Sequence, residues 1–339
     1  MTPPILDLVD VSKRFDPKLT LGDRIAAKLG GDVETRSVQA VRAVTLGIAK
    51  GETLGLVGES GCGKSTLGRI AAGIMRPTAG TVRLDGRPMM SESGTKLTTR
   101  VQTVFQDPFA SLNPRIKVGD TLMEGPIAHG LVPRAKAKAY VAEWLDLVGL
   151  DPAFAERYPH QFSGGQRQRI AIARALAMQP DVIVCDEPVA SLDVSIQAQI
   201  INLLLKLRRE LGLTYLFISH DLGVVRHISD RVAIMYLGRI VEIGETVALY
   251  ERPQHPYTQA LLASVPRLVT EEADLAEFRP IAGEIPSPLA PPPGCPFHTR
   301  CPHAGPRCPR EVPPLIPGSA ERPTACHLYT GGVGLDAAA

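Results

Sequence analysis

The sequence predicts an α/β fold in which helices flank a mainly parallel sheet. Three short apolar runs, 53–57, 181–188 and 214–218, have the composition of buried strands. Helices are expected from near Lys64 and over 196–211, so strands and helices alternate along the chain. This alternation is typical of parallel sheets, because each helix carries the chain back to the start of the next strand.

Local patterns predict the remaining elements in chain order. Residues 5–9 resemble an opening strand, and 20–29 place leucines and an isoleucine at helical spacing before two glycines. Residues 136–148 carry the apolar period of a helix, and Gly149 stands where a C-cap glycine would. After residue 251, proline-rich stretches predict an extended tail rather than a further sheet.

A glycine-rich loop joins the first core strand to its helix. The segment Gly58-Glu-Ser-Gly-Cys-Gly-Lys-Ser-Thr66 fits the pattern G-x-x-x-x-G-K-[ST]. Glycines let backbone N–H groups point at a phosphate, the helix N-terminus adds positive charge, Lys64 reaches the terminal phosphates and Ser65 binds Mg²⁺. A plain glycine turn with an exposed lysine is the alternative, which the strand and helix flanks disfavour. The predicted phosphate-binding residues are Gly58, Glu59, Ser60, Gly61, Cys62, Gly63, Lys64, Ser65 and Thr66.

Two adjacent carboxylates, Asp186 and Glu187, end the apolar run at 181–188. Ligands of open α/β sheets bind at the carboxyl ends of the strands. There Asp186 would hold Mg²⁺ through water, and Glu187 would orient or deprotonate the water that attacks the γ-phosphate. A turn or capping role is equally compatible with the pair alone. With the glycine loop earlier in the chain, the pair predicts the second half of a phosphoryl-transfer site.

Charge and hydropathy exclude several functional classes. The net charge of +2 over 339 residues gives no electrostatic signal for nucleic-acid binding. No apolar run approaches the roughly 18 residues that span a bilayer, and the N-terminus lacks the basic-then-apolar order of a secretory signal. We therefore expect a soluble chain whose membrane role, if any, comes through partners.

One segment indicates which family of phosphate-binding ATPases the chain resembles. The stretch Phe162-Ser-Gly-Gly-Gln-Arg-Gln-Arg-Ile-Ala-Ile-Ala-Arg-Ala-Leu176, with the order and spacing of the other motifs, resembles the ATP-binding subunit of an ABC transporter. The likeness covers essentially the whole chain. It is greatest for the second ATPase subunit of oligopeptide and dipeptide importers, through 157–165, 193–199 and the segment His255-Pro-Tyr-Thr-Gln-Ala-Leu261.

The resemblance implies further site residues. Gln106 would sense Mg²⁺ and nucleotide and link them to the membrane partner, and His220 would contact the γ-phosphate. Phe15 would stack on adenine, where the family more often has Tyr. Asp193 would lie across the dimer interface near the opposite site. The signature residues would bind the nucleotide of the other subunit: Ser163, Gly164, Gly165 and Gln166.

The same resemblance implies the domain organisation. We expect a P-loop NTPase ABC ATPase core over 1–251 with an antiparallel β edge, an insert at 16–40 and a helical signature subdomain over about 109–178. A Pro- and Cys-rich extension would follow over 252–339. The helix of the insert packs on its own domain or contacts a membrane partner, and we favour the first. Residues 111–115 would lie beside the docking surface for a membrane subunit.

The expected function is ATP hydrolysis that drives peptide import. The cofactors would be ATP and Mg²⁺, and the partners a second, related ATPase subunit, two transmembrane permease subunits and, through the complex, an extracytoplasmic peptide-binding protein. The chain would lie on the cytoplasmic face of the membrane and bind no nucleic acid. The alternatives are import of nickel or glutathione-like cargo, and a soluble ABC ATPase that acts on nucleic acid.

Four of the six cysteines fall in the tail, at Cys295, Cys301, Cys308 and Cys326. Disulfides are disfavoured in a chain without an export signal, and the spacing lacks the C-x-x-C knuckle of common zinc modules. A [4Fe-4S] cluster needs four thiolates, and the resemblance favours it because peptide-importer ATPases of this kind carry such a motif. Zinc and unmetallated thiols stay open. The nearby histidines are interpreted as surface residues rather than ligands: His298, His303 and His327.

Overall fold

The computed structural model describes residues 3–17, 37–107, 111–264, 281, 283–317 and 321–329. Its larger sheet has the strand order β10-β9-β3-β8-β7-β6. Neighbouring strands from β9 to β6 pair in parallel, and β10 joins the edge in the antiparallel sense. The predicted class is confirmed. The bounds are β3 Thr53–Val57, β6 Val101–Val104, β7 Val182–Asp186, β8 Thr214–Ile218, β9 Arg231–Tyr236 and β10 Arg239–Glu245.

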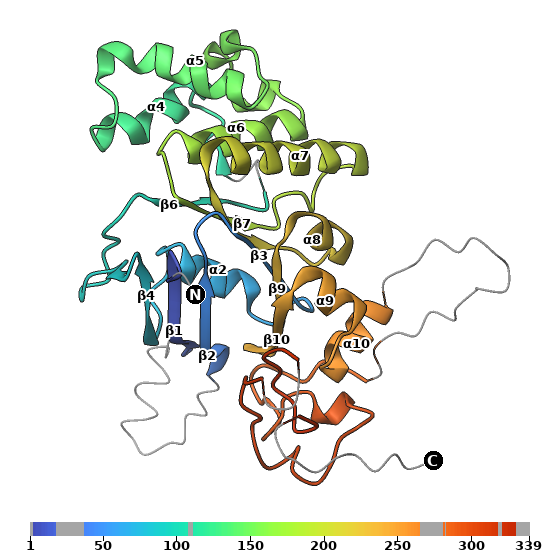
Figure 1. The fold of residues 1–339 in the computed structure, drawn as a ribbon. Coiled ribbons are helices and arrows are strands. Elements are labelled where there is room, and N and C mark those ends of the chain that lie inside the picture. Colours follow the sequence, from blue (N-terminus) through green and yellow to red (C-terminus); the bar gives the residue numbers. More distant parts are fainter. Residues whose placement is uncertain are drawn as a thin grey trace, which may run out of the picture.

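A second, antiparallel sheet with the order β2-β1-β4-β5 lies beside the larger one (Figure 1). Its alternating burial along β1 and β2 shows one face on the core and one toward solvent, as expected of an antiparallel layer. This sheet is the predicted antiparallel edge. It comprises β1 Leu6–Phe15, β2 Val38–Ile48, β4 Ala79–Leu84 and β5 Arg87–Pro88.

Helices cover the large sheet and form a separate layer of α4 to α7 at the far end from β1 and β2 (Figure 1). The helix expected at 20–29 lies outside the described residues, and so do 109–110 of the predicted helical subdomain. The α-helices are α2 Lys64–Ala71, α4 Val118–Ala128, α5 Ala137–Leu147, α6 Gly164–Leu176, α7 Val194–Leu211, α8 Leu222–Ile228, α9 Thr246–Glu251 and α10 Pro256–Ala263.

Two predicted helices have an apolar face and a terminal glycine. In α7 one face is buried, through residues that include Ile200, Leu204 and Leu207, and Gly212 ends the helix with a φ of 65°. In α5 the predicted C-cap Gly149 has a φ of 74°, which costs glycine little.

The C-terminal part differs from the expected extended tail. Residues 256–263 form a helix, α10, so the prediction is wrong there. The tail then folds back on the large sheet, where Thr324 bridges to Glu242 of β10. The ring of Phe297, 1% exposed, contacts the rings of Tyr236 and Tyr257 at 5.3 Å between centroids. Aromatic packing of this kind compensates for the low periodicity of a proline-rich segment.

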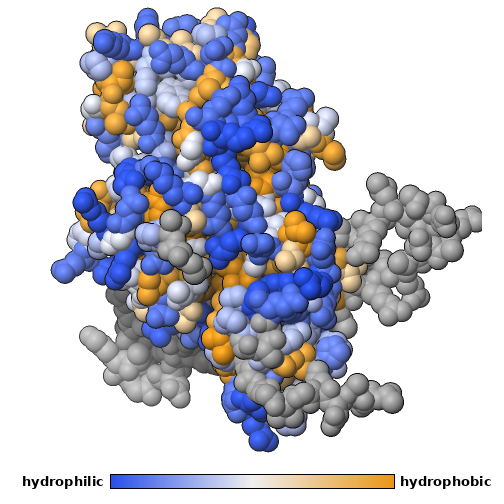
Figure 2. Space-filling model, in the orientation of Figure 1, coloured by the Kyte–Doolittle hydropathy of each residue, from blue (hydrophilic) through white to orange (hydrophobic). Residues whose placement is uncertain are grey.

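Hydrophilic and hydrophobic side chains are interspersed over the face drawn in Figure 2. Within the part of the chain that the structure describes, no helix has both the length and the apolar character needed to cross a bilayer.

The buried His255 makes stability depend on pH. It is 1% exposed, its Nδ1 accepts a hydrogen bond from the Tyr257 N–H at 3.0 Å, and burial lowers its pKa to about 4. The pKa in the folded chain lies below the unfolded value, so this contribution to stability is present above about pH 6.5 and is lost as the pH falls toward 4. We expect the free energy of unfolding to fall by roughly 2 kcal/mol between pH 8 and pH 5 through this group alone.

The measurement is urea unfolding of the wild type and His255→Asn at both pH values. Asn retains a helix N-cap acceptor but does not titrate, so the variant should lose that part of the pH dependence. His227→Asn, at an exposed position on α8, is the matched control and should change nothing. Equal pH dependence of His255→Asn and the wild type would contradict the assignment.

Candidate active site

The carboxyl ends of three adjacent strands bring the predicted residues to one edge of the large sheet. The glycine loop follows β3, the two carboxylates end and follow β7, and His220 follows β8. Asp186 pairs with Ile218, and Ile218 pairs with Leu56, so the three strand ends lie in one row. The sheet edge therefore assembles groups that are far apart in sequence.

A cavity of about 320 Å³ lies at this edge. It is lined by 60–66 of the glycine loop and also by Gln106 and Glu187. Gly58 and Glu59 begin the loop just outside the lining. The structure thus brings most of the predicted phosphate-binding segment around one space, together with the predicted water-directing carboxylate.

Close approach explains two glycines of the loop. A Cβ on Gly58 would lie 2.1 Å from the Met235 carbonyl oxygen, and one on Gly63 would lie 2.1 Å from that of Ala40. Gly63 also has a φ of 109°. Any larger residue would push the loop away from the strands behind it, so the chain can make this tight turn only with glycine.

The loop lysine and serine are held in place by hydrogen bonds. Lys64 Nζ donates to the carbonyl oxygens of Gly58 at 2.7 Å and Glu59 at 3.0 Å. Ser65 Oγ donates to Asp186 Oδ1 at 2.9 Å. Burial raises the pKa of the Asp186 carboxyl, against the opposing effect of the Ser65 hydrogen bond. A divalent cation beside this pair would stabilise the carboxylate, so the oxygen donors fit Mg²⁺.

Glu187 stands between two predicted site residues. Its Oε2 accepts a hydrogen bond from Gln106 Nε2 at 3.1 Å and lies 3.2 Å from His220 Nδ1. Its backbone has a φ of 49°, which costs a non-glycine residue about 1 to 2 kcal/mol, and its N–H donates to the Ile218 carbonyl. The neighbouring strand therefore holds the strained backbone that points the carboxylate into the cavity.

The signature segment lies on the helical layer, outside the lining of this cavity. Ser163 is the N-cap of α6, and its Oγ accepts from the Gln166 N–H at 3.3 Å while Gln166 Oε1 accepts from the Ser163 N–H at 3.1 Å. A Cβ on Gly165 would lie 2.6 Å from Ile196 Cγ2, and one on Gly164 would lie 3.3 Å from a Leu192 methyl. Within one chain the signature is thus a well-capped helix start.

Two other predicted residues also stand apart from the cavity lining. Phe15 ends β1, is 40% exposed and has Lys13 Nζ at 5.3 Å from its ring centroid. Asp193 is the N-cap residue of α7. In this chain neither side chain contributes to the walls of the space around the glycine loop.

The chain resembles known proteins over almost its whole length. Residues 41–190 match the family model described as ABC transporter, and 241–308 match the model described as oligopeptide/dipeptide transporter, C-terminal region. The oligopeptide transport ATP-binding protein AppF of Bacillus subtilis is 50% identical over 330 residues, which are 96% of this chain and 98% of that protein. This chain belongs to the ABC transporter ATP-binding family. The oligopeptide transport ATP-binding protein OppF of Salmonella typhimurium is 47% identical over 95% of both chains.

Solved structures agree with this membership. CbiO1 of Clostridium perfringens, part of an ABC transporter complex, superposes with a TM-score of 0.60 at 28% identity, over 74% of this chain and 92% of that one. A dimeric ATP-binding cassette, MJ0796, bound to ADP and Pi gives a TM-score of 0.58 at 29% identity, over 71% and 98%. The fold predicted from the motifs is confirmed, and the ABC subunit is an ATPase that uses ATP and Mg²⁺.

The C-terminal extension of this ABC subunit contributes residues that sequence reasoning missed. Pro288 and Pro291 line the cavity at the glycine loop. The Tyr257 hydroxyl accepts a hydrogen bond from the Glu59 N–H at 2.9 Å, and Arg300 binds the Glu59 carboxylate. The segment 255–261 was recognised only by resemblance, and nothing local to Arg300 indicated its partner.

The four tail cysteines gather around a separate cavity of about 230 Å³. Burial raises the pKa of Cys295 to about 11 and that of Cys326 to about 12, and it also raises that of Cys301. Among the described residues, no three metal-ligating side chains converge as they would on a single ion. Three histidines that were interpreted as surface residues also line this cavity: His298, His303 and His327.

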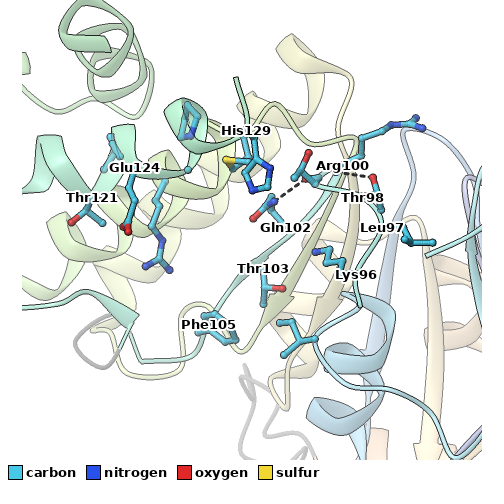
Figure 3. A pocket seen from close by; sticks show the side chains of 17 residues that line it. Lys96, Leu97, Thr98, Arg100, Gln102, Thr103, Phe105, Thr121, Glu124 and His129 are labelled. Atoms are coloured by element: carbon cyan, nitrogen blue, oxygen red, sulfur yellow. Dashed lines mark hydrogen bonds between the residues drawn. The ribbon is translucent and has the colours of Figure 1, made fainter. Parts of the chain in front are cut away.

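A larger groove of about 840 Å³ lies between the helical layer and β6 (Figure 3). Thr121 and Glu124 of α4 line one side, and Gln102 and Thr103 of β6 line the other. Phe105, next to Gln106, forms part of its wall. The groove therefore touches the same short segment that reaches the cavity at the glycine loop.

Proposed function

We propose that the chain is the ATP-hydrolysing, energy-coupling subunit of an ABC importer for di- or oligopeptides. The observation that carries this proposal is the match of 241–308 to the oligopeptide/dipeptide transporter C-terminal region, on a chain that also carries the ABC core. The relatives AppF and OppF, named as oligopeptide transport proteins, support the same cargo class.

The site residues divide the chemistry of hydrolysis between them. Glu187 orients the attacking water, while Lys64, Ser65 and His220 stabilise the negative charge that develops as the γ-phosphate leaves. Asp186 and Gln106 complete the set that would hold the metal with Ser65. When bound, Mg²⁺ supplies charge neutralisation on the phosphate oxygens. Phosphoryl transfer needs mainly positioning and charge, which this arrangement offers.

The signature completes a site on a second ATPase subunit. Ser163, Gly165 and Gln166 begin α6, whose N-terminus is suited to binding a phosphate held by the partner. Asp193 would lie near the same interface, and Phe15 would stack on the adenine of its own site. A dimeric relative bound to ADP and Pi supports this pairing.

The groove beside Phe105 suits a segment of a transmembrane subunit. Phe105, which lines the groove, is the sequence neighbour of Gln106, and Arg174 of the groove wall donates a hydrogen bond to the carbonyl oxygen of Ser111, the first residue of 111–115. This chain would be a peripheral subunit on the cytoplasmic face of the membrane. It would assemble with two permease subunits, a related ATPase and, through the complex, an extracytoplasmic peptide-binding protein.

We also propose the domain boundary near residue 251, with the insert at 16–40 and the helical subdomain at about 109–178.

The cysteine cavity suits a [4Fe-4S] cluster better than one zinc ion. All four tail cysteines line it, and its volume of about 230 Å³ is larger than a single ion needs. Cys295, Cys301, Cys308 and Cys326 would supply the thiolates. Unmetallated thiols and zinc are the competing states, and both are outcomes of the test below.

Replacing Glu187 with Gln should abolish turnover and leave ATP binding intact. The amide keeps the shape of the side chain but cannot direct or deprotonate the water. The measurements are ATP hydrolysis and equilibrium ATP binding by the full chain. Glu210→Gln, on the exposed part of α7, is the control and should hydrolyse ATP as the wild type does. Wild-type hydrolysis by Glu187→Gln would refute the role.

Protein purified without oxygen should absorb at about 400 nm and contain iron, as a thiolate-bound cluster does. Cys308→Ser should lose the band and the iron, while Cys185→Ser should keep both, because Cys185 is buried in β7 away from the tail cavity. Colourless protein with stoichiometric zinc, or with no metal, would contradict the cluster.

The transport role predicts the composition of the membrane complex. With this subunit tagged, two polytopic membrane proteins and a second ATPase should co-purify from detergent-solubilised membranes, and peptides should be the cargo. Nickel or glutathione-like cargo with the same partners would correct the substrate class. ATPase activity stimulated by DNA or ribosomes, without membrane partners, would favour the soluble alternative instead.

A further inference from the structure

A buried arginine of the C-terminal extension binds the glycine loop. The Arg300 guanidinium donates to the two carboxylate oxygens of Glu59 at 2.8 and 3.0 Å. Its side chain is 4% exposed and that of Glu59 is 18% exposed, so the pair is largely removed from water. The rings of Tyr236 and Phe297 each lie 5.9 Å from the guanidinium carbon. A bidentate pair in this setting fixes both position and orientation.

Glu59 is held on three sides. Arg300 binds its carboxylate, the Tyr257 hydroxyl accepts from its N–H at 2.9 Å, and Lys64 Nζ donates to its carbonyl at 3.0 Å. Two of these contacts come from the C-terminal extension, 198 and 241 residues away in sequence. The third comes from the lysine that binds phosphate. The extension and the phosphate-binding lysine therefore meet on one loop residue.

The charge of Glu59 needs a partner at this place. It is the second residue of a loop that binds a polyanion, and an unpaired carboxylate there would repel the phosphates in a partly buried, weakly screened setting. Arg300 neutralises it, which leaves Lys64 and the loop N–H groups to determine the local potential. A buried ion pair rarely stabilises a fold more than apolar residues would in its place. The Arg300–Glu59 pair is therefore better explained by its effect on the glycine loop, which it holds in one position.

We propose that Arg300 is a positioning residue for ATP binding, which acts through Glu59 to neutralise and fix the glycine loop. The C-terminal extension is then a part of the nucleotide site as well as a family-specific appendage. This inference rests on the proposed placement of ATP at the glycine loop.

The test is equilibrium binding of MgATP to the full chain, with KM and kcat for hydrolysis. Arg300→Met should raise the Kd and KM for ATP roughly ten- to thirtyfold by leaving Glu59 unpaired, while kcat at saturation changes little. Arg300→Met combined with Glu59→Gln should bind ATP within about threefold of the wild type, because neither charge is then left alone. Arg300→Lys should recover part of the affinity, and added salt should reduce the difference in Kd for ATP between Arg300→Met and the wild type.

Arg322 provides the matched control. It forms a comparably buried pair with Glu242, at 3.0 Å, and joins the same extension to β10 without contact to the glycine loop. Arg322→Met should lower stability like Arg300→Met but leave the Kd for ATP unchanged. Equal loss of ATP affinity in both variants, or a double variant as weak as Arg300→Met, would overturn the proposal.

Two further comparisons keep the outcomes distinct. If Arg300→Met does not fold, Glu59→Gln is compared with the double variant: equal ATP affinities support the proposal, and a large loss in the double variant refutes it. Lys64→Ala tests the placement of ATP itself. Undiminished binding by Lys64→Ala would refute the proposed site, whereas loss in Lys64→Ala with wild-type binding by Arg300→Met would refute only the role of Arg300.

Discussion

The parallel register of β3, β8 and β7 is the constraint on which the site depends. Leu56, Ile218 and Asp186 lie in one row across these strands, so the three chain segments leave the sheet at the same level. The Ser65–Asp186 hydrogen bond and the bond from the Glu187 N–H to Ile218 cross between these ends. A slip of one residue in any pair would turn Asp186 or its partners to the opposite face of the sheet.

How much could be read from the sequence depended on how local each signal was. The strands 53–57 and 214–218 were predicted to the residue, because a buried parallel strand is an unbroken apolar run between polar flanks. The helix α10 was missed because the prolines around it suggested an extended chain. The Arg300–Glu59 contact spans 241 residues, and no local pattern encodes a pair that only the folded tail brings together. Pro288 and Pro291, which line the cavity at the glycine loop, were missed because they too are distant from that loop in sequence.

The two parts of the predicted nucleotide site differ in how complete they are within one chain. The groups on the sheet edge already contact one another: Gln106 and His220 both lie against Glu187. The signature residues hydrogen-bond to one another instead, since the side chains of Ser163 and Gln166 each accept a hydrogen bond from the other residue's N–H at the start of α6. This reciprocal capping fixes the start of the helix before any ligand binds, and other N–H groups of the first turn can still bind an anion. A helix end ordered in advance loses less entropy on binding, which would favour the proposed closure of one subunit on another.

Buried ion pairs dock the C-terminal extension on the ATPase core in one position, although the extension has little helical or strand periodicity. Its prolines and few large apolar groups offer a limited core, yet two buried arginines, Arg300 and Arg322, each bind a glutamate of the ATPase core. A buried ion pair stabilises less than packed apolar groups of the same volume, but leaving one partner alone is costly. The correct docking of the extension therefore differs sharply in free energy from any shifted one. Since one of those glutamates belongs to the glycine loop, a shift of the extension would displace the loop at which we propose that ATP binds. A change at the cysteine cavity would reach the same loop through Cys301 and its sequence neighbour Arg300.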